Sequence, residues 1–174
     1  MQLGRGEAIC DTARVMSRFV SAIMIRANRH DEVVELAVHA DIPVINGLSD
    51  REHPCQILAD IMTIEEWLFR TEGIKVAWIG DGNNVCTSLI LSTILTGMEV
   101  IVASPEEFSP KKEVIQEAQK MGAKVRVVTD PFFAAESADV VMTDTWISMG
   151  QEEEIDQRRK IFMPYQVNSK VMSY

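Results

Sequence analysis

Segments that suit strands alternate with segments that suit helices along the whole sequence, and this alternation limits the folds open to the chain. Short apolar runs indicate strands, and apolar residues three or four positions apart indicate helices. A chain with this pattern is expected to form an α/β fold, in which parallel sheets are flanked by helices. The expected helices are 7–20, 31–40, 54–69, 84–96, 109–121 and 132–137, and the expected strands are 21–27, 42–48, 75–80, 99–103, 124–128 and 139–143.

The long helix 54–69 divides this series into two parts. A new strand–helix series begins after it at Lys75, and the motif content of the sequence changes at the same place. We therefore predict an α/β domain over residues 1–53, a connecting helix over 54–70 and a second α/β domain over 71–174. In folds of this kind ligands bind at the carboxyl ends of the strands, so the polar residues that follow the strands are the candidates for a site.

Composition and charge exclude several classes of function. Hydrophobic residues make up 47% of the 174 residues, which is enough for a buried core and typical of a globular chain. The 26 acidic and 17 basic residues give a net charge of −9, which repels nucleic-acid phosphates and anionic lipid. No apolar run is long enough to span a bilayer, and no secretory segment is visible. We expect neither nucleic acid nor a membrane as a partner.

The cysteines and histidines do not form a metal-binding motif. Their spacing resembles neither a zinc site nor a disulfide framework, and it favours reduced thiols in a reducing compartment. We therefore expect no metal in this chain. The residues concerned are Cys10, Cys55, Cys86, His30, His39 and His53.

The stretch from Ser49 to Gln56 is the first candidate site. Pro54 suits the first position of a helix, which leaves His53 beside the unpaired amide donors of the first turn. Those donors and the helix dipole favour an anion, and His53 and Gln56 can donate to a carbonyl or phosphoryl oxygen. The alternative is an ordinary helix start with a hydrogen-bonded histidine.

Arg26 is the second candidate, because it ends an otherwise apolar strand at the expected carboxyl edge of a sheet. A planar guanidinium at that edge suits a phosphate or a carboxylate. A solvated charge or a structural ion pair explains the same residue equally well.

Two further candidates follow strands of the second domain. The turn 80–84 lacks the third glycine of a dinucleotide fingerprint, but its two asparagines, Asn83 and Asn84, offer amide groups to a small polar ligand. Asp144 follows another buried strand and could hold an ammonium group at the same edge. Ordinary turn or capping chemistry is the alternative for both candidates. The acidic run 152–154 and the basic run 158–160 are expected on a solvated helix, without chemistry, and Met16, Met24 and Met62 are expected to fill the core.

Taken together, five motifs closely resemble those of the ornithine carbamoyltransferases, in order and spacing, across essentially the whole chain. The His-Pro-Cys-Gln motif combined with the Asp-x-x-x-Ser-Met-Gly motif separates this family from the aspartate carbamoyltransferases. The motifs are Leu3-Gly-Arg-Gly-Glu7, Asp11-Thr-Ala-Arg14, His53-Pro-Cys-Gln56, Gly80-Asp-Gly-Asn-Asn84 and Asp144-Thr-Trp-Ile-Ser-Met-Gly150.

The resemblance implies two Rossmann-like domains and a reaction in which the side-chain amine of L-ornithine attacks carbamoyl phosphate. The products are L-citrulline and phosphate, and no cofactor takes part. Arg26 and His53 are implied to be catalytic, and the carbamoyl-phosphate-binding residues are implied to be Arg26, His53, Pro54, Cys55 and Gln56. The ornithine-binding residues are implied to be Asn84, Asp144, Ser148 and Met149, the last through its backbone.

The sequence also departs from the family pattern. The family's Ser-x-Arg-Thr-Arg segment does not precede Leu3, and its His-Cys-Leu-Pro motif and a later arginine do not follow within the chain. The chain thus resembles the central part of the enzyme, and alone it is expected to be inactive or nearly so. For the complete enzyme the resemblance implies a homotrimer of arginine biosynthesis or the urea cycle, located in the cytoplasm or, in a eukaryote, the mitochondrial matrix.

Two other functions stay open from the sequence. A non-catalytic module derived from a carbamoyltransferase would bind an amino acid or a partner chain without turnover. A related enzyme would use another amine, such as putrescine or an acylated ornithine. The Ser148-Met-Gly150 segment argues against the second alternative.

Overall fold

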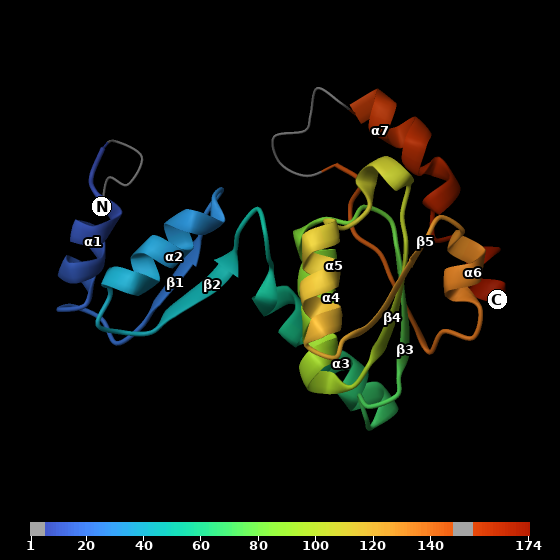
Figure 1. Ribbon diagram of the computed structural model, residues 1–174, viewed down its shortest axis with the longest axis horizontal. Coiled ribbons are helices and arrows are strands. Elements are labelled where there is room, and N and C mark those ends of the chain that lie inside the picture. The colour runs from blue at the N-terminus through green and yellow to red at the C-terminus, as the bar shows by residue number, and fades with distance from the viewer. Residues whose placement is uncertain (1–5, 148–154) are drawn as a thin grey trace. The chain divides into compact units, whose positions relative to one another are not determined.

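The computed structural model describes residues 6–147 and 155–174 (Figure 1). The chain forms two compact units, Met1–Leu58 and Ala59–Tyr174. The boundary between them falls inside helix α3, which runs over Pro54–Leu68.

The first unit contains a small parallel sheet and two helices. Its elements in chain order are α1 (Ile9–Met16), β1 (Ile23–Arg26), α2 (His30–His39) and β2 (Val44–Leu48). Strands β1 and β2 pair in parallel from Ile23 opposite Val44 to Arg26 opposite Leu48, with a shift in register before Arg26. Helices α1 and α2 contact each other and bury Ala13 and Leu36.

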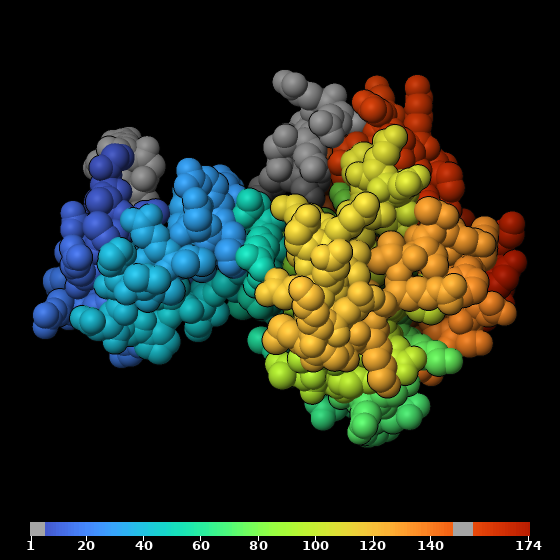
Figure 2. Space-filling view, in the orientation of Figure 1, coloured from blue at the N-terminus to red at the C-terminus, as the bar shows by residue number. Residues whose placement is uncertain are grey.

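The second unit is a four-stranded parallel sheet with helices on both faces. The strand order is β5-β4-β3-β6. Helices α4 and α5 lie on one face and α6 lies on the other (Figure 1), and α5 forms much of the surface seen in Figure 2, in yellow. The remaining elements are β3 (Lys75–Ile79), α4 (Asn84–Thr96), β4 (Glu99–Ala103), η2 (Glu106–Phe108), α5 (Lys112–Lys120), β5 (Lys124–Val128), α6 (Pro131–Ala135), β6 (Val140–Met142), α7 (Ile155–Phe162), η4 (Met163–Tyr165) and η5 (Val171–Ser173).

Strand β3 lies in the middle of this sheet and is buried on both faces. Only Lys75, its first residue, is exposed, because helices cover both sides of the strand. On the α6 face, Ala77 and Ile79 pack in a cluster that includes Phe162 and Tyr165. The prediction of an α/β fold with parallel sheets flanked by helices is therefore confirmed.

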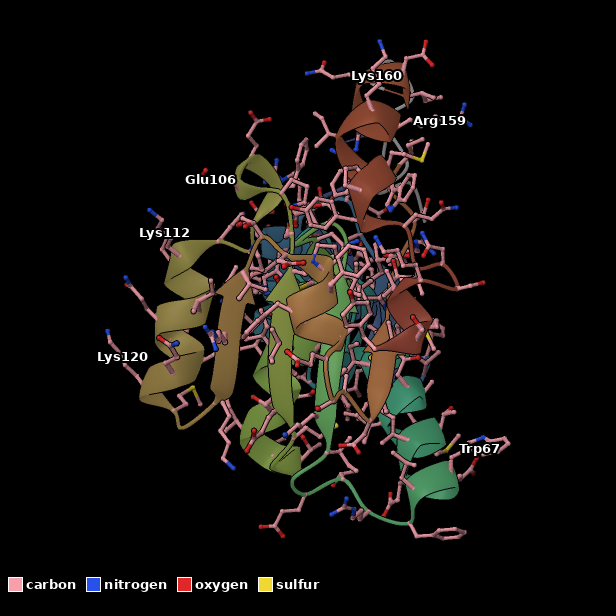
Figure 3. All side chains as sticks on the ribbon, turned by 90° about the vertical axis from the view of Figure 1, so that its right-hand side faces the viewer. Trp67, Glu106, Lys112, Lys120, Arg159 and Lys160 are labelled. Carbon is pink, nitrogen blue, oxygen red and sulfur yellow. The ribbon has the colours of Figure 1, made fainter. Side chains whose placement is uncertain are left out.

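Some details differ from the sequence prediction. The first helix ends at Met16, four residues early, where the Ser17 hydroxyl donates to the Ala13 carbonyl and the chain turns. The prediction that methionines fill the core is wrong for Met24 and Met62, which are 67% and 57% exposed. Trp67, near the end of α3, is also exposed and projects from the helix (Figure 3).

Within the described ranges, no helix is both long and apolar enough to cross a membrane.

Candidate functional site

The strand order of the second unit reverses between β3 and β6. Strands β3, β4 and β5 follow one another outward, and the chain then returns to pair β6 on the other side of β3. The carboxyl ends of β3 and β6 lead into the polar turns 80–84 and 143–147. In open α/β sheets a reversal of this kind opens the crevice in which ligands bind.

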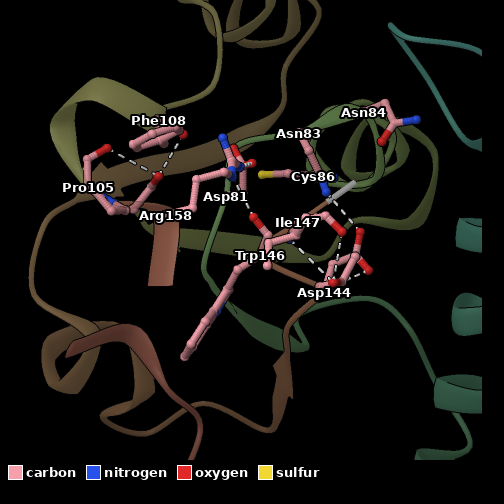
Figure 4. Close-up of polar contacts among 12 residues, drawn as sticks. Asp81, Asn83, Asn84, Cys86, Pro105, Phe108, Asp144, Trp146, Ile147 and Arg158 are labelled. Atoms are coloured by element: carbon pink, nitrogen blue, oxygen red, sulfur yellow. Dashed lines mark hydrogen bonds and ion pairs between the residues drawn. The ribbon is translucent and has the colours of Figure 1, made fainter. Parts of the chain in front are cut away.

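Asn83 joins these two turns. Its side-chain oxygen accepts hydrogen bonds from the backbone amides of Val85 and Cys86, at 3.0 and 3.1 Å, and so caps α4. Its side-chain nitrogen donates to the Asp144 carboxylate at 2.8 Å (Figure 4). The Asp144 carboxylate is thus held beside the start of α4, where the helix dipole favours negative charge.

The sequence placed Asn84 at this edge, but the direct partner of Asp144 is Asn83. The side-chain oxygen of Asn84 accepts from the amide of Val85 at 3.0 Å, and the residue is half-buried. The preference of asparagine for the N-cap position could have assigned the capping role to Asn83.

A pocket of about 460 Å³ opens beside Asp144. It brings a carboxylate, a guanidinium and an amide to one hollow, from Asp144, Arg159 and Gln166. Trp146 and Val167 supply apolar walls. Groups of both charges suit a zwitterionic amino acid. Ser148 and Met149, the other predicted ornithine-binding residues, lie outside the described residues.

The prediction of a solvated basic run over 158–160 is wrong for Arg158. Arg159 and Lys160 are exposed, and Lys160 points outward from α7 (Figure 3), but Arg158 is 3% exposed and forms an ion pair with Asp81. Burial raises the pKa of the Asp81 carboxyl, and the neighbouring Arg158 acts in the opposite direction. No sequence pattern indicated a role for either residue.

The candidate residues of the first unit follow its two parallel strands. Arg26 is exposed at the end of β1, opposite Leu48 of β2. His53 precedes α3, and its backbone carbonyl accepts from the Ile57 amide at 3.3 Å. Pro54 is the first residue of that helix, as predicted. Gln56 is exposed one turn along.

Ser49 shapes the turn that leads to His53. It is fully buried, its amide donates to the Glu52 carbonyl at 2.8 Å, and its hydroxyl accepts from the Glu52 amide at 3.2 Å. The same hydroxyl lies 2.9 Å from Nδ1 of His30, at the start of α2. Sequence reasoning missed the contact between Ser49 and His30, because the residues lie 19 positions apart and no local pattern links them.

No group of three or more histidine, cysteine or acidic side chains that could hold a metal occurs in the part of the chain that the structure describes. Cys55 is exposed in the first turn of α3, whereas Cys86 is buried in α4. Burial, and to a smaller extent the charge of Asp81, raises the pKa of the Cys86 thiol well above its ordinary value.

We therefore expect Cys55 to react with a thiol reagent in the folded protein and Cys86 to react only after unfolding, because the reactive form is the thiolate. Since the thiolate of Cys86 forms more easily in the unfolded chain, stability is expected to fall as the pH rises past the ordinary thiol pKa of 9.0. Iodoacetamide labelling at pH 8 with peptide mass spectrometry measures the first effect, and urea unfolding between pH 8 and 10 measures the second. Equal labelling of both cysteines in the native protein would contradict the assignment.

Two family models cover almost the whole chain. The model described as "Aspartate/ornithine carbamoyltransferase, carbamoyl-P binding domain" matches residues 1–66. The model described as "Aspartate/ornithine carbamoyltransferase, Asp/Orn binding domain" matches residues 72–174.

Curated relatives agree with these models. The ornithine carbamoyltransferase of Methanospirillum hungatei JF-1 is 86% identical over 173 residues, which are 99% of this chain and 57% of that protein. The ornithine carbamoyltransferase of Archaeoglobus fulgidus is 50% identical over 174 residues, which are 100% of this chain and 57% of that protein. The chain thus spans a little over half the length of these relatives.

Solved structures are similar too. The ornithine carbamoyltransferase from Pyrococcus furiosus matches with a TM-score of 0.91 and 50% identity, covering 99% of this chain and 56% of that one. The anabolic ornithine carbamoyltransferase from Campylobacter jejuni matches with a TM-score of 0.93 and 42% identity, covering 99% and 59%.

Proposed function

The chain belongs to the aspartate/ornithine carbamoyltransferase family, and from this premise we propose that it forms the central part of an ornithine carbamoyltransferase. The proposed reaction transfers the carbamoyl group of carbamoyl phosphate to the side-chain amine of L-ornithine. The observation that carries the proposal is the match of one family model to each half of the chain, together with the high identity to relatives named as ornithine carbamoyltransferases.

The first unit is proposed to hold carbamoyl phosphate. The amine lone pair attacks the carbonyl carbon, the bond from that carbon to the phosphate oxygen breaks, phosphate leaves and the amine loses a proton. Negative charge develops on the carbonyl oxygen and on the leaving phosphate. Arg26, His53 and Gln56 can donate hydrogen bonds to these oxygens, with the start of α3 nearby at Pro54 and Cys55.

The second unit is proposed to hold the amino-acid end of ornithine. The Asp144 carboxylate suits the α-ammonium group, and the amide of Asn84 suits the carboxylate. Ser148 and the Met149 backbone complete the set that the family resemblance implies. Holding one end of the substrate fixes the direction of the distal amine, and this positioning contributes to the rate without any acid or base.

We propose further that the complete enzyme is a homotrimer in arginine biosynthesis or the urea cycle. Its location would be the cytoplasm or the mitochondrial matrix. The family resemblance and the reducing compartment indicated by the unpaired cysteines support these points.

The protein as its gene encodes it is expected to release citrulline and phosphate in equal amounts from carbamoyl phosphate and L-ornithine. With L-aspartate or putrescine as the amine, turnover is expected to be at least about a hundredfold slower. Aspartate has no distal amine, and putrescine leaves the polar groups that hold the amino-acid end unpaired. Colorimetric citrulline and phosphate assays measure both rates. If the gene encodes a longer chain, the 174 residues alone are expected to lose at least about a hundredfold in rate, because transition-state donors are removed.

Turnover that prefers another amine would refute the ornithine assignment. Calorimetric binding of L-ornithine without citrulline formation would favour the alternative of a non-catalytic binding module.

A further inference from the structure

We propose that the buried ion pair of Asp81 and Arg158 is a positioning device that holds the Asp144 carboxylate in the orientation that binds the amino-acid substrate. This inference rests on the proposed function and names two residues that act on the site without touching the substrate. It assigns a role to a pair that the catalytic chemistry does not use.

Arg158 joins three segments of the chain. It comes from α7, and its guanidinium pairs with Asp81, which follows β3. Its Nε donates to the carbonyl of Trp146, which follows β6, at 2.6 Å. The two charged side chains are 4% and 13% exposed, so water competes little with these bonds. One side chain therefore ties together the turns after β3 and β6.

Two aromatic rings fix the plane of the guanidinium. Its central carbon lies 4.6 Å from the ring centre of Phe108 and 5.3 Å from that of Phe162. Figure 4 shows Arg158 between Phe108 and the Asp81 turn. A planar fork stacked on aromatic rings has little freedom to turn, and a lysine cannot reproduce either the fork or the stacking.

The turn that carries Asp81 is also held tightly. Trp78 donates from its indole nitrogen to the Asp81 carbonyl at 2.9 Å, and the Gly82 amide donates to the Phe108 carbonyl at 2.8 Å. A Cβ atom at position 82 would lie against the backbone nitrogen of Pro110 and 2.7 Å from the Phe108 carbonyl oxygen. There is no room for a side chain at Gly82, because the backbone of this turn packs directly against Phe108 and Pro110.

Both of these turns hold Asp144 in place. Asn83, two residues after Asp81, donates to the Asp144 carboxylate, and Trp146, two residues after Asp144, is held through its carbonyl by Arg158. The guanidinium thus fixes the segment that carries the carboxylate and the segment that carries its hydrogen-bond donor. A displacement of about 1 Å in a group that orients a substrate costs roughly a hundredfold in rate.

The test is Arg158→Met, with Lys160→Met on the exposed face of the same helix as the matched control. In the protein as its gene encodes it, Arg158→Met is expected to raise the KM for L-ornithine about tenfold or more, through misplacement of Asp144. The KM for carbamoyl phosphate is expected to stay within about twofold, because its proposed ligands lie in the other unit, and the control is expected to leave both values within about twofold.

A double variant separates positioning from stability. Removing one partner leaves an uncompensated buried charge, whereas removing both in Asp81→Asn with Arg158→Met removes the charge imbalance and is expected to restore much of the stability in urea. The KM for L-ornithine is expected to stay raised in the double variant, because the Trp146 carbonyl still lacks its donor. The double variant leaves neither charge unpaired, so it also provides the folded variant for the ornithine KM if Arg158→Met does not fold.

Recovery of the ornithine KM together with stability would overturn the inference and reduce the pair to a structural role. So would single variants that lose stability with an unchanged ornithine KM. These results require a parent protein that forms citrulline from L-ornithine; a parent that does not would refute the proposed function, and the inference with it.

Discussion

Replacing Arg26 by methionine is expected to lower kcat/KM for carbamoyl phosphate by roughly 10²- to 10³-fold. Arg26 ends β1 at the carboxyl edge of the first unit's sheet, with its side chain exposed. Its proposed task is to donate to oxygens that gain negative charge as the carbonyl is attacked and phosphate leaves. Methionine keeps an unbranched apolar stem of similar length, so the strand is expected to retain its pairing with β2 while the charge is lost.

Arg18→Met is the matched control, because Arg18 is an exposed arginine of the same unit. Steady-state kinetics with each substrate varied in turn measure the effect. The ornithine KM is expected to change little, since its proposed ligands belong to the other unit. An Arg26→Met enzyme within about twofold of the parent would remove Arg26 from the proposed site, because one lost transition-state donor has a far larger effect.

Replacing Phe162 by alanine is expected to lower the free energy of unfolding of the second unit by about 3–5 kcal/mol. Phe162 is fully buried at the end of α7. Its ring centre lies 4.9 Å from that of Phe108, 6.2 Å from that of Trp146 and 6.3 Å from that of Tyr165. Truncation leaves a cavity among rigid rings that cannot close over it, which places the cost in the upper part of the range for core residues.

Urea unfolding followed by tryptophan fluorescence measures this loss. All three tryptophans, Trp67, Trp78 and Trp146, belong to the second unit, so the signal reports on that unit. Phe69→Ala is the control, because Phe69 is 88% exposed and its truncation is expected to change the free energy by less than about 0.5 kcal/mol. Equal unfolding midpoints for the two variants would show that the aromatic cluster does not stabilise the unit.

The sequence predicted the strands of the second unit well because their signals are local. The apolar run 76–79 lies between Lys75 and a glycine turn, and the structure buries all four residues. The start of α4 at Asn84 and its end before Gly97 were likewise predictable, since Gly97 adopts a left-handed conformation, with φ of 69°, that favours glycine.

The burial of Arg158 could not be predicted in this way. Its neighbours Arg159 and Lys160 give the segment the pattern of a solvated face, and its partner Asp81 lies 77 positions earlier in the chain. The contact between Asn83 and Asp144 spans 61 positions and depends on the pairing of β6 with β3. Such contacts follow from strand order, which a single sequence does not reveal. The assignments of Arg26, His53 and Gln56 to carbamoyl phosphate, and of Asn84 and Asp144 to ornithine, stay predictions.

Helix α7 gives two adjacent arginines opposite environments, one sealed among aromatic rings and one lining the open pocket beside Asp144. This division matters for protein engineers who seek a different amine acceptor. Libraries that vary Arg159 and Gln166 would change the chemistry of the pocket while the turns after β3 and β6 stay in place. Libraries that vary position 158 would displace those turns. Two neighbouring residues of α7 thus differ in whether they can be redesigned or have to be kept.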